Sequence, residues 1–528
     1  MNKISISTLA VAVSLGAIAA HAQVGQFENW KEAAKGRAAK TACDHLRALT
    51  GYDFAIDAAS VVPAQGDTPE FCQVQGLIAP EIRFEVGLPK EWNGRLYMFG
   101  NGGFAGESLA SPGRVSIRNA ALRRGFATAQ TNTGHDAARE PLATFAANPQ
   151  KLVDYAYRAV HVTALTAKSI VRAHYDAPAS RSYFVGCSNG GRQGLISAQR
   201  FPDDFDGIVV GAPALDFTGT MAHFVAINRA LSATPISADR VRIVAEKVGE
   251  TCDAADGLAD GLIDDPRRCR FDVAKAVPQC ATAGDTGACL TEAQIKALGA
   301  VYGDVTSKGA RVAPGFPVGA EAFVPSPAGP RSGWVPWIIS EGQPTIAFQL
   351  MESFFKEMVT PGTPIDWRQF EPDRDMEKMS TIGTLLNATD PDLTRFRARG
   401  GKILMYFGWA DPALNPLMGV NYYEQVRQTM GTGTAEFFRL FMMPGVLHCQ
   451  GGLGPSQFDS ITPLVDWVER GTAPDRLVAA LRQDGKTIRT RPLCAYPAVA
   501  KFTEGGNKDD AGSFACSAPA QPTSSTVR

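Results

Sequence analysis

A serine set between two glycines is the first residue of this chain that could do chemistry. Residues 182–195 read Ser-Tyr-Phe-Val-Gly-Cys-Ser-Asn-Gly-Gly-Arg-Gln-Gly-Leu, so an apolar strand runs into Gly-x-Ser-x-Gly and a helix-like stretch follows. This arrangement is typical of a nucleophile elbow, whose sharp strand-to-helix turn exposes the serine hydroxyl at the carboxyl end of a sheet. A plain glycine-rich turn is the alternative. The flanking strand and helix favour Ser188 as a nucleophile.

A serine hydroxyl becomes a good nucleophile only when a base accepts its proton. Two histidines follow Ser188, namely His223 and His448. His448 ends a strand-and-loop unit that begins at Phe437, as a base loop should, whereas His223 lies in a segment with few strand signals. We therefore predict that His448 is the base and that His223 is an ordinary, partly buried histidine.

In folds with a nucleophile elbow, the acid of the triad precedes the histidine along the chain and ends a core strand. The apolar run 402–407 leads through Gly-Trp-Ala into Asp411, which would hold the imidazole in the correct tautomer. A turn aspartate before Pro412 is the alternative interpretation of Asp411, and Glu424 is a weak competitor. The sequence predicts the triad Ser188, Asp411 and His448.

An oxyanion hole needs two N–H groups. The first would come from Asn189, directly after the nucleophile. The second would come from the loop after an early strand, where Phe-Gly-Asn-Gly-Gly at 99–103 offers Gly102 or Gly103. A glycine turn without this role is the alternative.

Strand-like and helix-like runs alternate around these residues, which predicts an α/β-hydrolase core: three layers around a largely parallel sheet. The pattern lapses where Pro, Gly and Asp are abundant, and we interpret that stretch as an inserted lid domain. The predicted organisation is a signal peptide over 1–22, core over 23–215, lid over 216–393, and core with a C-terminal tail over 394–528. The predicted strands are 84–88, 95–99, 126–131, 182–185, 207–210, 402–407 and 437–443, with a helix over 152–174.

The first residues predict export. Lys3 precedes an apolar run, and small residues at Ala20 and Ala22 mark a cleavage site, so we expect a periplasmic or secreted protein. A membrane anchor is the alternative. The 52 basic and 53 acidic residues balance, and no concentrated basic face suggests nucleic acid or a membrane as a partner.

Ten cysteines in an exported chain argue for five disulfides, although sequence alone does not decide their connectivity. Proximity along the chain suggests four pairs and leaves Cys187 with Cys449. These two flank Ser188 and His448, so a correct triad would bring them to the same place. The four proximity pairs are Cys43–Cys72, Cys252–Cys269, Cys280–Cys289 and Cys494–Cys516.

Five aspartates lie within residues 253–265, and close-set carboxylates repel unless water or a cation neutralises them. Hard oxygen ligands suit Ca²⁺, although the spacing does not match an EF-hand. A solvated acidic loop is the alternative. A disulfide between Cys252 and Cys269 would favour an ordered site with a structural role in the lid.

Several stretches together resemble the tannase/feruloyl esterase family, which includes feruloyl esterases, tannases and mono(hydroxyethyl) terephthalate hydrolases. The resemblance spans nearly the whole mature chain. It implies the Cys187–Cys449 bond, esters of aromatic acids such as hydroxycinnamates or gallates as substrates, and calcium held by Asp253, Asp256, Asp260 and the carbonyls of Leu258 and Leu262. The matching stretches are 186–192, 204–208, 211–213, 408–411, 443–455 and 466–471.

The lid should supply the pocket for the aromatic acid, and we expect Trp334, Trp337 and Phe348 to stack on its ring. No Arg or Lys lies between Ser332 and Phe355, whereas the resemblance implies an arginine clamp in terephthalate half-ester hydrolases. A small neutral aromatic ester is therefore the expected substrate, unless Arg331 or Lys356 reaches inward. A half-ester hydrolase, a serine peptidase and a non-catalytic, calcium-stabilised binding protein are the rival functions.

Overall fold

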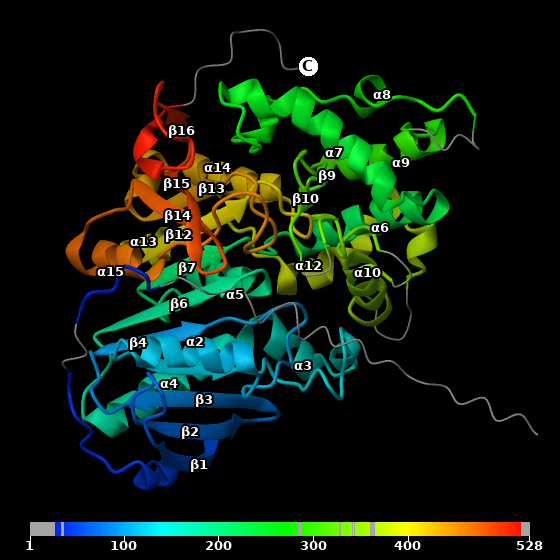
Figure 1. The fold of residues 1–528 in the computed structure, drawn as a ribbon. Helices are drawn as coiled ribbons and strands as arrows, with labels where there is room; N and C mark the ends of the chain where they lie inside the picture. The colour runs from blue at the N-terminus through cyan, green and yellow to red at the C-terminus, as the bar shows by residue number, and fades with distance from the viewer. Residues whose placement is uncertain are drawn as a thin grey trace, which may run out of the picture.

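A nine-stranded sheet forms the centre of the protein (Figure 1). The computed structural model describes residues 27–32, 36–282, 288–326, 329–340, 342, 344–359 and 365–518, so the predicted signal peptide lies outside the described residues. The strand order is β1-β2-β3-β5-β4-β6-β7-β12-β13. Their bounds are β1 Phe54–Val62, β2 Phe71–Ile78, β3 Ile82–Pro89, β4 Arg95–Phe99, β5 Ala127–Thr131, β6 Arg181–Cys187, β7 Gly207–Gly211, β12 Lys402–Gly408 and β13 Phe438–Met443.

All seven strands expected from the sequence are present, and the sheet is mostly parallel. The pairs β4–β5, β4–β6, β6–β7, β7–β12 and β12–β13 are parallel. The strands β1 and β2, which the sequence did not reveal, extend the sheet antiparallel on β3. Every residue of β4, β5 and β7 is buried, including the polar side chains Thr128, Gln130 and Thr131 of β5.

Helices cover both faces of the sheet. Adjacent residues of a strand point to opposite faces. On β7, Ile208 lies against Gly194 of α5 (Asn189–Arg200), whereas a side chain at Gly207 would meet Val468 of α15 (Ile461–Arg470). The three-layer α/β architecture follows. The other helices beside the sheet are α2 Pro112–Leu122, α3 Pro149–Val153, α4 Ala159–Tyr175 and α14 Pro416–Met430.

The helix expected over 152–174 is interrupted near its start. The helices α3 and α4 are joined by a π-helical turn over Asp154–Arg158, in which the backbone bonds reach one residue further than in an α-helix. Composition does not reveal such a turn, because the apolar spacing on either side of it remains helical.

The chain leaves the sheet after β7 and returns to it at β12. In the described parts of residues 212–401, no segment adds a strand to the nine-stranded sheet. This green-to-yellow part lies beside the sheet in Figure 1. The predicted lid boundaries fall inside this stretch and stay a prediction. Its longer helices are α6 Phe217–Ala233, α7 Ala238–Cys252, α9 Glu292–Tyr302, α10 Ile346–Glu357 and α12 Ser380–Leu386. It also contains two short hairpins, β8 Val305–Ser307 with β9 Ala310–Ala313 and β10 Phe323–Val324 with β11 Arg331–Ser332.

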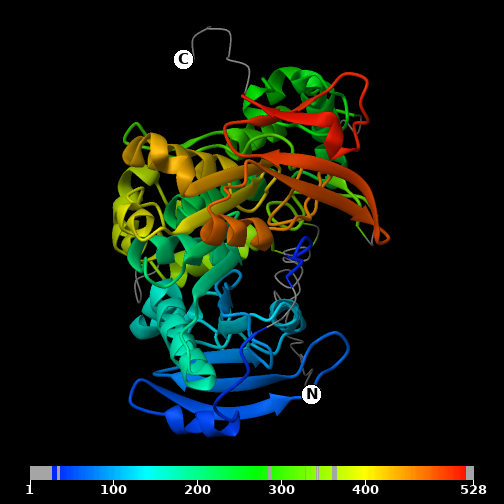
Figure 2. The same cartoon turned by 90° about the vertical axis from the view of Figure 1, so that its left-hand side faces the viewer.

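Two further hairpins follow α15. Figures 1 and 2 both place these orange-to-red elements at the opposite end of the molecule from the blue strands β1 to β3. They also cover the outer strand β13, which β15 contacts. They consist of β14 Arg476–Gln483 with β15 Lys486–Cys494, and β16 Val499–Phe502 with β17 Phe514–Ser517.

The five expected disulfides are confirmed. They are Cys43–Cys72, Cys187–Cys449, Cys252–Cys269, Cys280–Cys289 and Cys494–Cys516.

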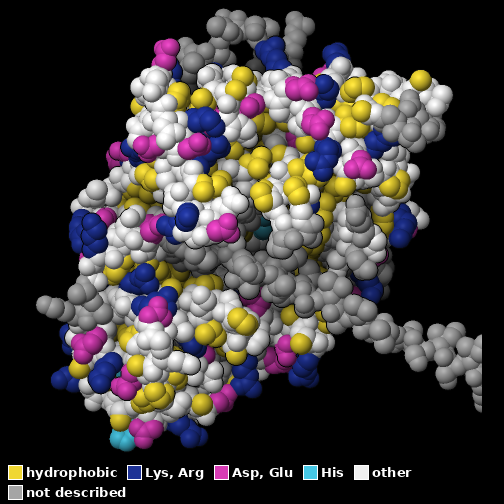
Figure 3. Space-filling view, viewed as in Figure 1, with side chains coloured by type: hydrophobic (Ala, Val, Ile, Leu, Met, Phe, Trp, Pro, Cys, Tyr) yellow, Lys and Arg dark blue, Asp and Glu magenta, His cyan; other side chains and the backbone are white. Residues whose placement is uncertain are grey.

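Basic and acidic side chains are interspersed over the face seen in Figure 3, without a concentration of one sign. None of the described helices is both long and apolar enough to cross a bilayer.

Candidate active site

Ser188 lies at the turn between β6 and α5, in a backbone conformation that few residues other than glycine adopt. Its φ is 63° and its ψ is −125°. A Cβ on Gly186 would come within 2.4 Å of the Gly190 backbone, so this turn requires glycine at that position. The Ser188 N–H donates to the carbonyl of Gly211 at 3.0 Å, which ties the turn to β7. The strand, turn and helix therefore form an elbow with Ser188 at its tip.

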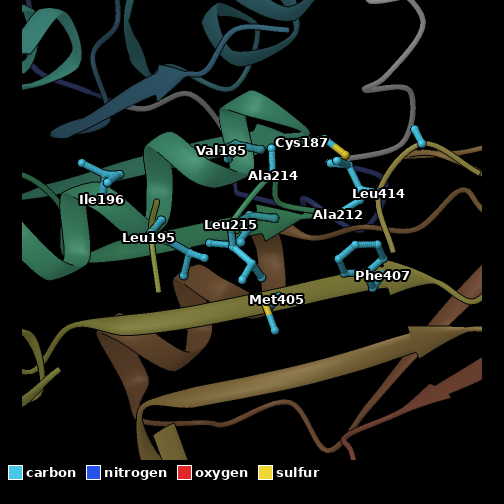
Figure 4. Close-up of a cluster of buried hydrophobic side chains, with 14 of the residues drawn as sticks. Val185, Cys187, Leu195, Ile196, Ala212, Ala214, Leu215, Met405, Phe407 and Leu414 are labelled. Atoms are coloured by element: carbon cyan, nitrogen blue, oxygen red, sulfur yellow. The ribbon is translucent and has the colours of Figure 1, made fainter. Parts of the chain in front are cut away.

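The core beneath this elbow is apolar. Figure 4 shows buried side chains from β6, α5, β12 and the segment after β7 gathered into one cluster. Such packing holds the strand and the helix in place on either side of the turn.

Asp411 and His448 lie together at the ends of β12 and β13. The His448 Nδ1 is 2.8 Å from Asp411 Oδ2. The other carboxylate oxygen, Oδ1, accepts the N–H groups of Ala413 and Leu414 at 2.8 and 2.9 Å. These two amides orient the carboxylate, whose side chain is fully buried. With Nδ1–H donating to Asp411, the His448 Nε2 is left as a proton acceptor.

The disulfide between Cys187 and Cys449 joins the elbow to the histidine loop. The two Cα atoms are 6.0 Å apart, and each cysteine is the chain neighbour of Ser188 or His448. The nucleophile and the base candidates are thus brought to the same place by a covalent link.

The competing residues lie elsewhere. His223 is buried on α6, where its Nε2 is 3.1 Å from the carbonyl oxygen of Ala300, and burial lowers its pKa to about 4. Glu424 forms an ion pair with Arg427 on α14. The structure therefore brings His448 and Asp411 together, and neither competitor joins them.

The loop after β4 lies against the start of α5. A Cβ on Gly100 would come within 2.6 Å of the Gly190 Cα, so two backbones are in direct contact here. The Gly102 N–H donates to Glu107 Oε1 at 3.3 Å, and Glu107 in turn pairs with Arg114 at 2.6 Å. Over the part of the chain that the structure describes, no hydrogen bond engages the Gly103 N–H.

The three predicted pocket aromatics have different surroundings. The Trp337 ring meets the His448 ring edge-on, with centroids 5.1 Å apart. Trp334 is only 2% exposed and packs against Tyr302, whereas Phe348 packs against Trp367. Of the three, Trp337 is the residue with a ring contact to the histidine.

The two cations that flank the aromatic stretch 332–355 are both exposed. Arg331 lies on the surface, at one end of the short hairpin β10–β11. The Lys356 side chain is 67% exposed and pairs with Glu357 at 3.2 Å. Neither cation points into the interior.

The acidic loop after α7 is held in tight turns by its own carboxylates. Asp253 Oδ1 accepts two backbone N–H groups, one of them from Asp260 at 3.1 Å. Asp260 forms a buried ion pair with Arg491 of β15. Burial, followed by the charge of Asp256, raises the pKa of Asp264 to about 7. The loop is therefore ordered, and the charges of its carboxylates act on one another.

Arg491 is a partner that the sequence did not reveal, because more than two hundred residues separate it from the loop. Among the described residues, no three His, Cys, Asp or Glu side chains converge as a ready-made metal site. Part of the charge in this loop is thus neutralised by an arginine.

This chain is similar to known ester hydrolases. The family model described as tannase and feruloyl esterase matches residues 66–517. The mono(2-hydroxyethyl) terephthalate hydrolase of Piscinibacter sakaiensis is 35% identical over 88% of this chain and 87% of its own length. A probable feruloyl esterase B of Aspergillus niger is 32% identical over 82% and 83% of the two chains.

Solved structures show the same fold. The crystal structure of feruloyl esterase B from Aspergillus oryzae superposes with a TM-score of 0.80 at 26% identity, covering 90% of this chain and 99% of that one. Because the family model spans most of the sequence and two relatives above 30% identity cover more than four fifths of it, this chain belongs to the tannase and feruloyl esterase family of carboxylic-ester hydrolases.

Proposed function

We propose that this enzyme hydrolyses esters of aromatic acids through a covalent acyl-enzyme. Ser188 Oγ attacks the ester carbonyl while His448 Nε2 accepts its proton, and Asp411 stabilises the resulting imidazolium. His448 then protonates the leaving alcohol, and a water activated by the same base releases the acid. The Asp411–His448 hydrogen bond, joined to the elbow by the Cys187–Cys449 disulfide, is the observation that carries this proposal.

The oxyanion of the tetrahedral intermediate would be held by two backbone amides. Asn189 begins α5, where the first N–H groups of a helix have no partner within it. Between the two glycines, we choose Gly103, because the Gly102 N–H is already donated to Glu107. A buried amide aimed at developing negative charge is worth on the order of 10²-fold or more in kcat.

We propose neutral hydroxycinnamate or gallate esters as the substrates, with Trp337 beside the acyl group. The names of the feruloyl esterase relatives support this class. The terephthalate half-ester is the alternative, because a relative at 35% identity carries that name. Its free carboxylate would need a cation, and Arg331 and Lys356 are both exposed. An unpaired buried carboxylate is strongly unfavourable.

Ser188→Ala tests the mechanism. The change removes one hydroxyl, so the fold should persist while kcat falls by roughly 10³-fold or more. A fluorophosphonate should label the native enzyme and not the variant. Retention of most of the turnover in the variant would refute the assignment, and an unlabelled native enzyme would favour a non-catalytic binding protein.

A substrate panel tests the acyl group. We expect kcat/KM for methyl ferulate or methyl gallate to exceed that for the terephthalate half-ester by at least about tenfold, which corresponds to about 1.4 kcal/mol. Equal turnover would overturn the preference. Efficient cleavage of the matching amide, in addition to the ester, would identify a peptidase instead.

We further propose that the protein is exported and that its acidic loop holds calcium. Five disulfides favour an oxidising compartment. The calcium ligands would be Asp253, Asp256 and Asp260 with the carbonyls of Leu258 and Leu262, and the Cys252–Cys269 disulfide closes the loop around them. The ion's role would be structural, and the Asp260–Arg491 pair is the competing means of neutralisation.

A further inference from the structure

A buried tyrosine touches both residues that would supply the oxyanion hole. The hydroxyl of Tyr155 lies 3.1 Å from the carbonyl oxygen of Gly103 and 3.2 Å from Oδ1 of Asn189. Tyr155 is only 1% exposed, so neither contact competes with bulk water. The ring is fixed in turn by Phe104 and Phe145, with centroid separations of 6.3 and 5.2 Å.

Gly103 needs such a contact because packing does not hold it. Its φ is +47°, and a Cβ built there would meet nothing within 4 Å. A glycine in open space can rotate at little cost, and rotation would swing its N–H away from the oxyanion. The hydroxyl of Tyr155 restrains the carbonyl on the other side of the same residue.

Asn189 is held from the opposite side by an arginine. The Nε of Arg192 donates to Asn189 Oδ1 at 2.8 Å, which decides the orientation of this side-chain amide. Arg192 is completely buried and has no carboxylate partner among the described residues. Three more of its N–H groups donate to the backbone carbonyls of Tyr155, Ala156 and Leu386.

One short segment, the π-helical turn, supplies both the Tyr155 side chain and two of the carbonyls that Arg192 contacts. Tyr155 and Ala156 lie within the turn Asp154–Arg158 and present their carbonyls to Arg192. The guanidinium also lies over the Tyr155 ring, 5.0 Å from its centroid. π-turns inside α-helices frequently occur at functional sites.

We propose that Tyr155 is a positioning residue that sets the separation between the Gly103 and Asn189 amides, with Arg192 locking Asn189. This inference rests on the proposed function, since it requires those amides to be the oxyanion donors. Burial raises the pKa of Tyr155 to about 12, so its hydroxyl keeps its single proton at neutral pH and shares it between the Gly103 carbonyl and Asn189 Oδ1.

Tyr155→Phe removes only the hydroxyl and is the decisive variant. We expect kcat for methyl ferulate to fall by about 10- to 100-fold with KM within about twofold, because displacing a catalytic group by about 1 Å can cost on the order of 10²-fold. Phenylboronic acid forms a tetrahedral adduct with an active serine. Its affinity should fall by the same factor as kcat/KM, while the affinity for ferulate should not change.

Tyr175→Phe is the matched control. It removes the hydroxyl of another buried tyrosine, the last residue of α4, which donates to the carbonyl of Pro89 at 2.6 Å. Its kcat should stay within about twofold of the native value. An equal loss in both variants would mean that lost stability, rather than positioning, explains the effect, and would overturn the proposal.

Arg192→Lys gives a second route if Tyr155→Phe does not fold, because an ammonium cannot bond Asn189 and three carbonyls together. The same loss in kcat and boronate affinity is expected. If Ser188→Ala is inactive while Tyr155→Phe keeps full kcat and boronate affinity, only this inference fails. If Ser188→Ala stays active, the proposed function fails first.

Discussion

Removal of the Cys187–Cys449 disulfide tests how the catalytic parts are held together. We predict that Cys187→Ala combined with Cys449→Ala lowers both stability and turnover. The bond joins the end of β6 to the loop after β13 across 262 residues of chain. Without it, the hydrogen bond to Asp411 and the edge contact with Trp337 still hold His448 from its own side. No covalent link would then hold His448 beside Ser188.

The loss of stability follows from the length of the closed loop. In the chain-entropy model, a crosslink across 262 residues stabilises the fold by about 5.5 kcal/mol. The loss of activity follows from geometry. A shift of His448 by about 1 Å relative to Ser188 costs on the order of 10²-fold in kcat. We therefore expect a folded, less stable enzyme with about one hundredth of the native turnover.

The assay is steady-state hydrolysis of methyl ferulate, with urea unfolding measured on the same preparations. Removal of the Cys43–Cys72 disulfide is the control. It closes 29 residues between β2 and the segment before β1, so it should lower stability by about 3.6 kcal/mol without changing kcat. Native kcat in the Cys187/Cys449 variant would refute the reasoning, and an equal loss of kcat in both variants would assign the effect to stability alone.

Three further changes test other parts of the protein. A chelator should lower the melting temperature before it affects kcat, because an ion that binds only the folded protein stabilises the folded state. Absence of both stoichiometric calcium and a shift in melting temperature would contradict the calcium site. Trp337→Ala should raise KM for methyl ferulate roughly tenfold through lost ring contacts, whereas Phe348→Ala should change KM less. Equal effects on KM would contradict the placement of Trp337 beside the acyl group. Burial raises the pKa of Glu321 from its usual 4.5 to about 7, so the folded state binds the extra proton between these values and stability falls as pH rises through them. Glu321→Gln should make the melting temperature less dependent on pH between these two values. An unchanged dependence would show that other groups cause the fall in stability.

Local pattern was sufficient for the parts of this enzyme that are built from neighbouring residues. The elbow could be predicted because a strand, a tight turn and a helix each leave a mark within residues 182–195. The order serine, acid, histidine then selected Asp411 and His448, since parallel strands of one sheet bring their carboxyl ends to the same edge. The disulfide pairs followed from proximity, because four of them close short loops.

Contacts between distant segments decided the rest. The sequence left Gly102 and Gly103 open as alternatives for the oxyanion hole, and the bond from Gly102 to Glu107 is the reason that we propose Gly103. The sequence offered three aromatic residues for the pocket, and only the packing of the segment between β7 and β12 shows that Trp337 is beside the histidine while Trp334 is interior.

The role of Tyr155 was invisible in the sequence for the same reason. Its partners Gly103 and Asn189 are 52 and 34 residues away, and its own position depends on one π-turn within an otherwise regular helix. Sequence periodicity reports which face of an element is buried. It does not report which side chains from other elements meet that face, because that depends on how the elements pack in three dimensions.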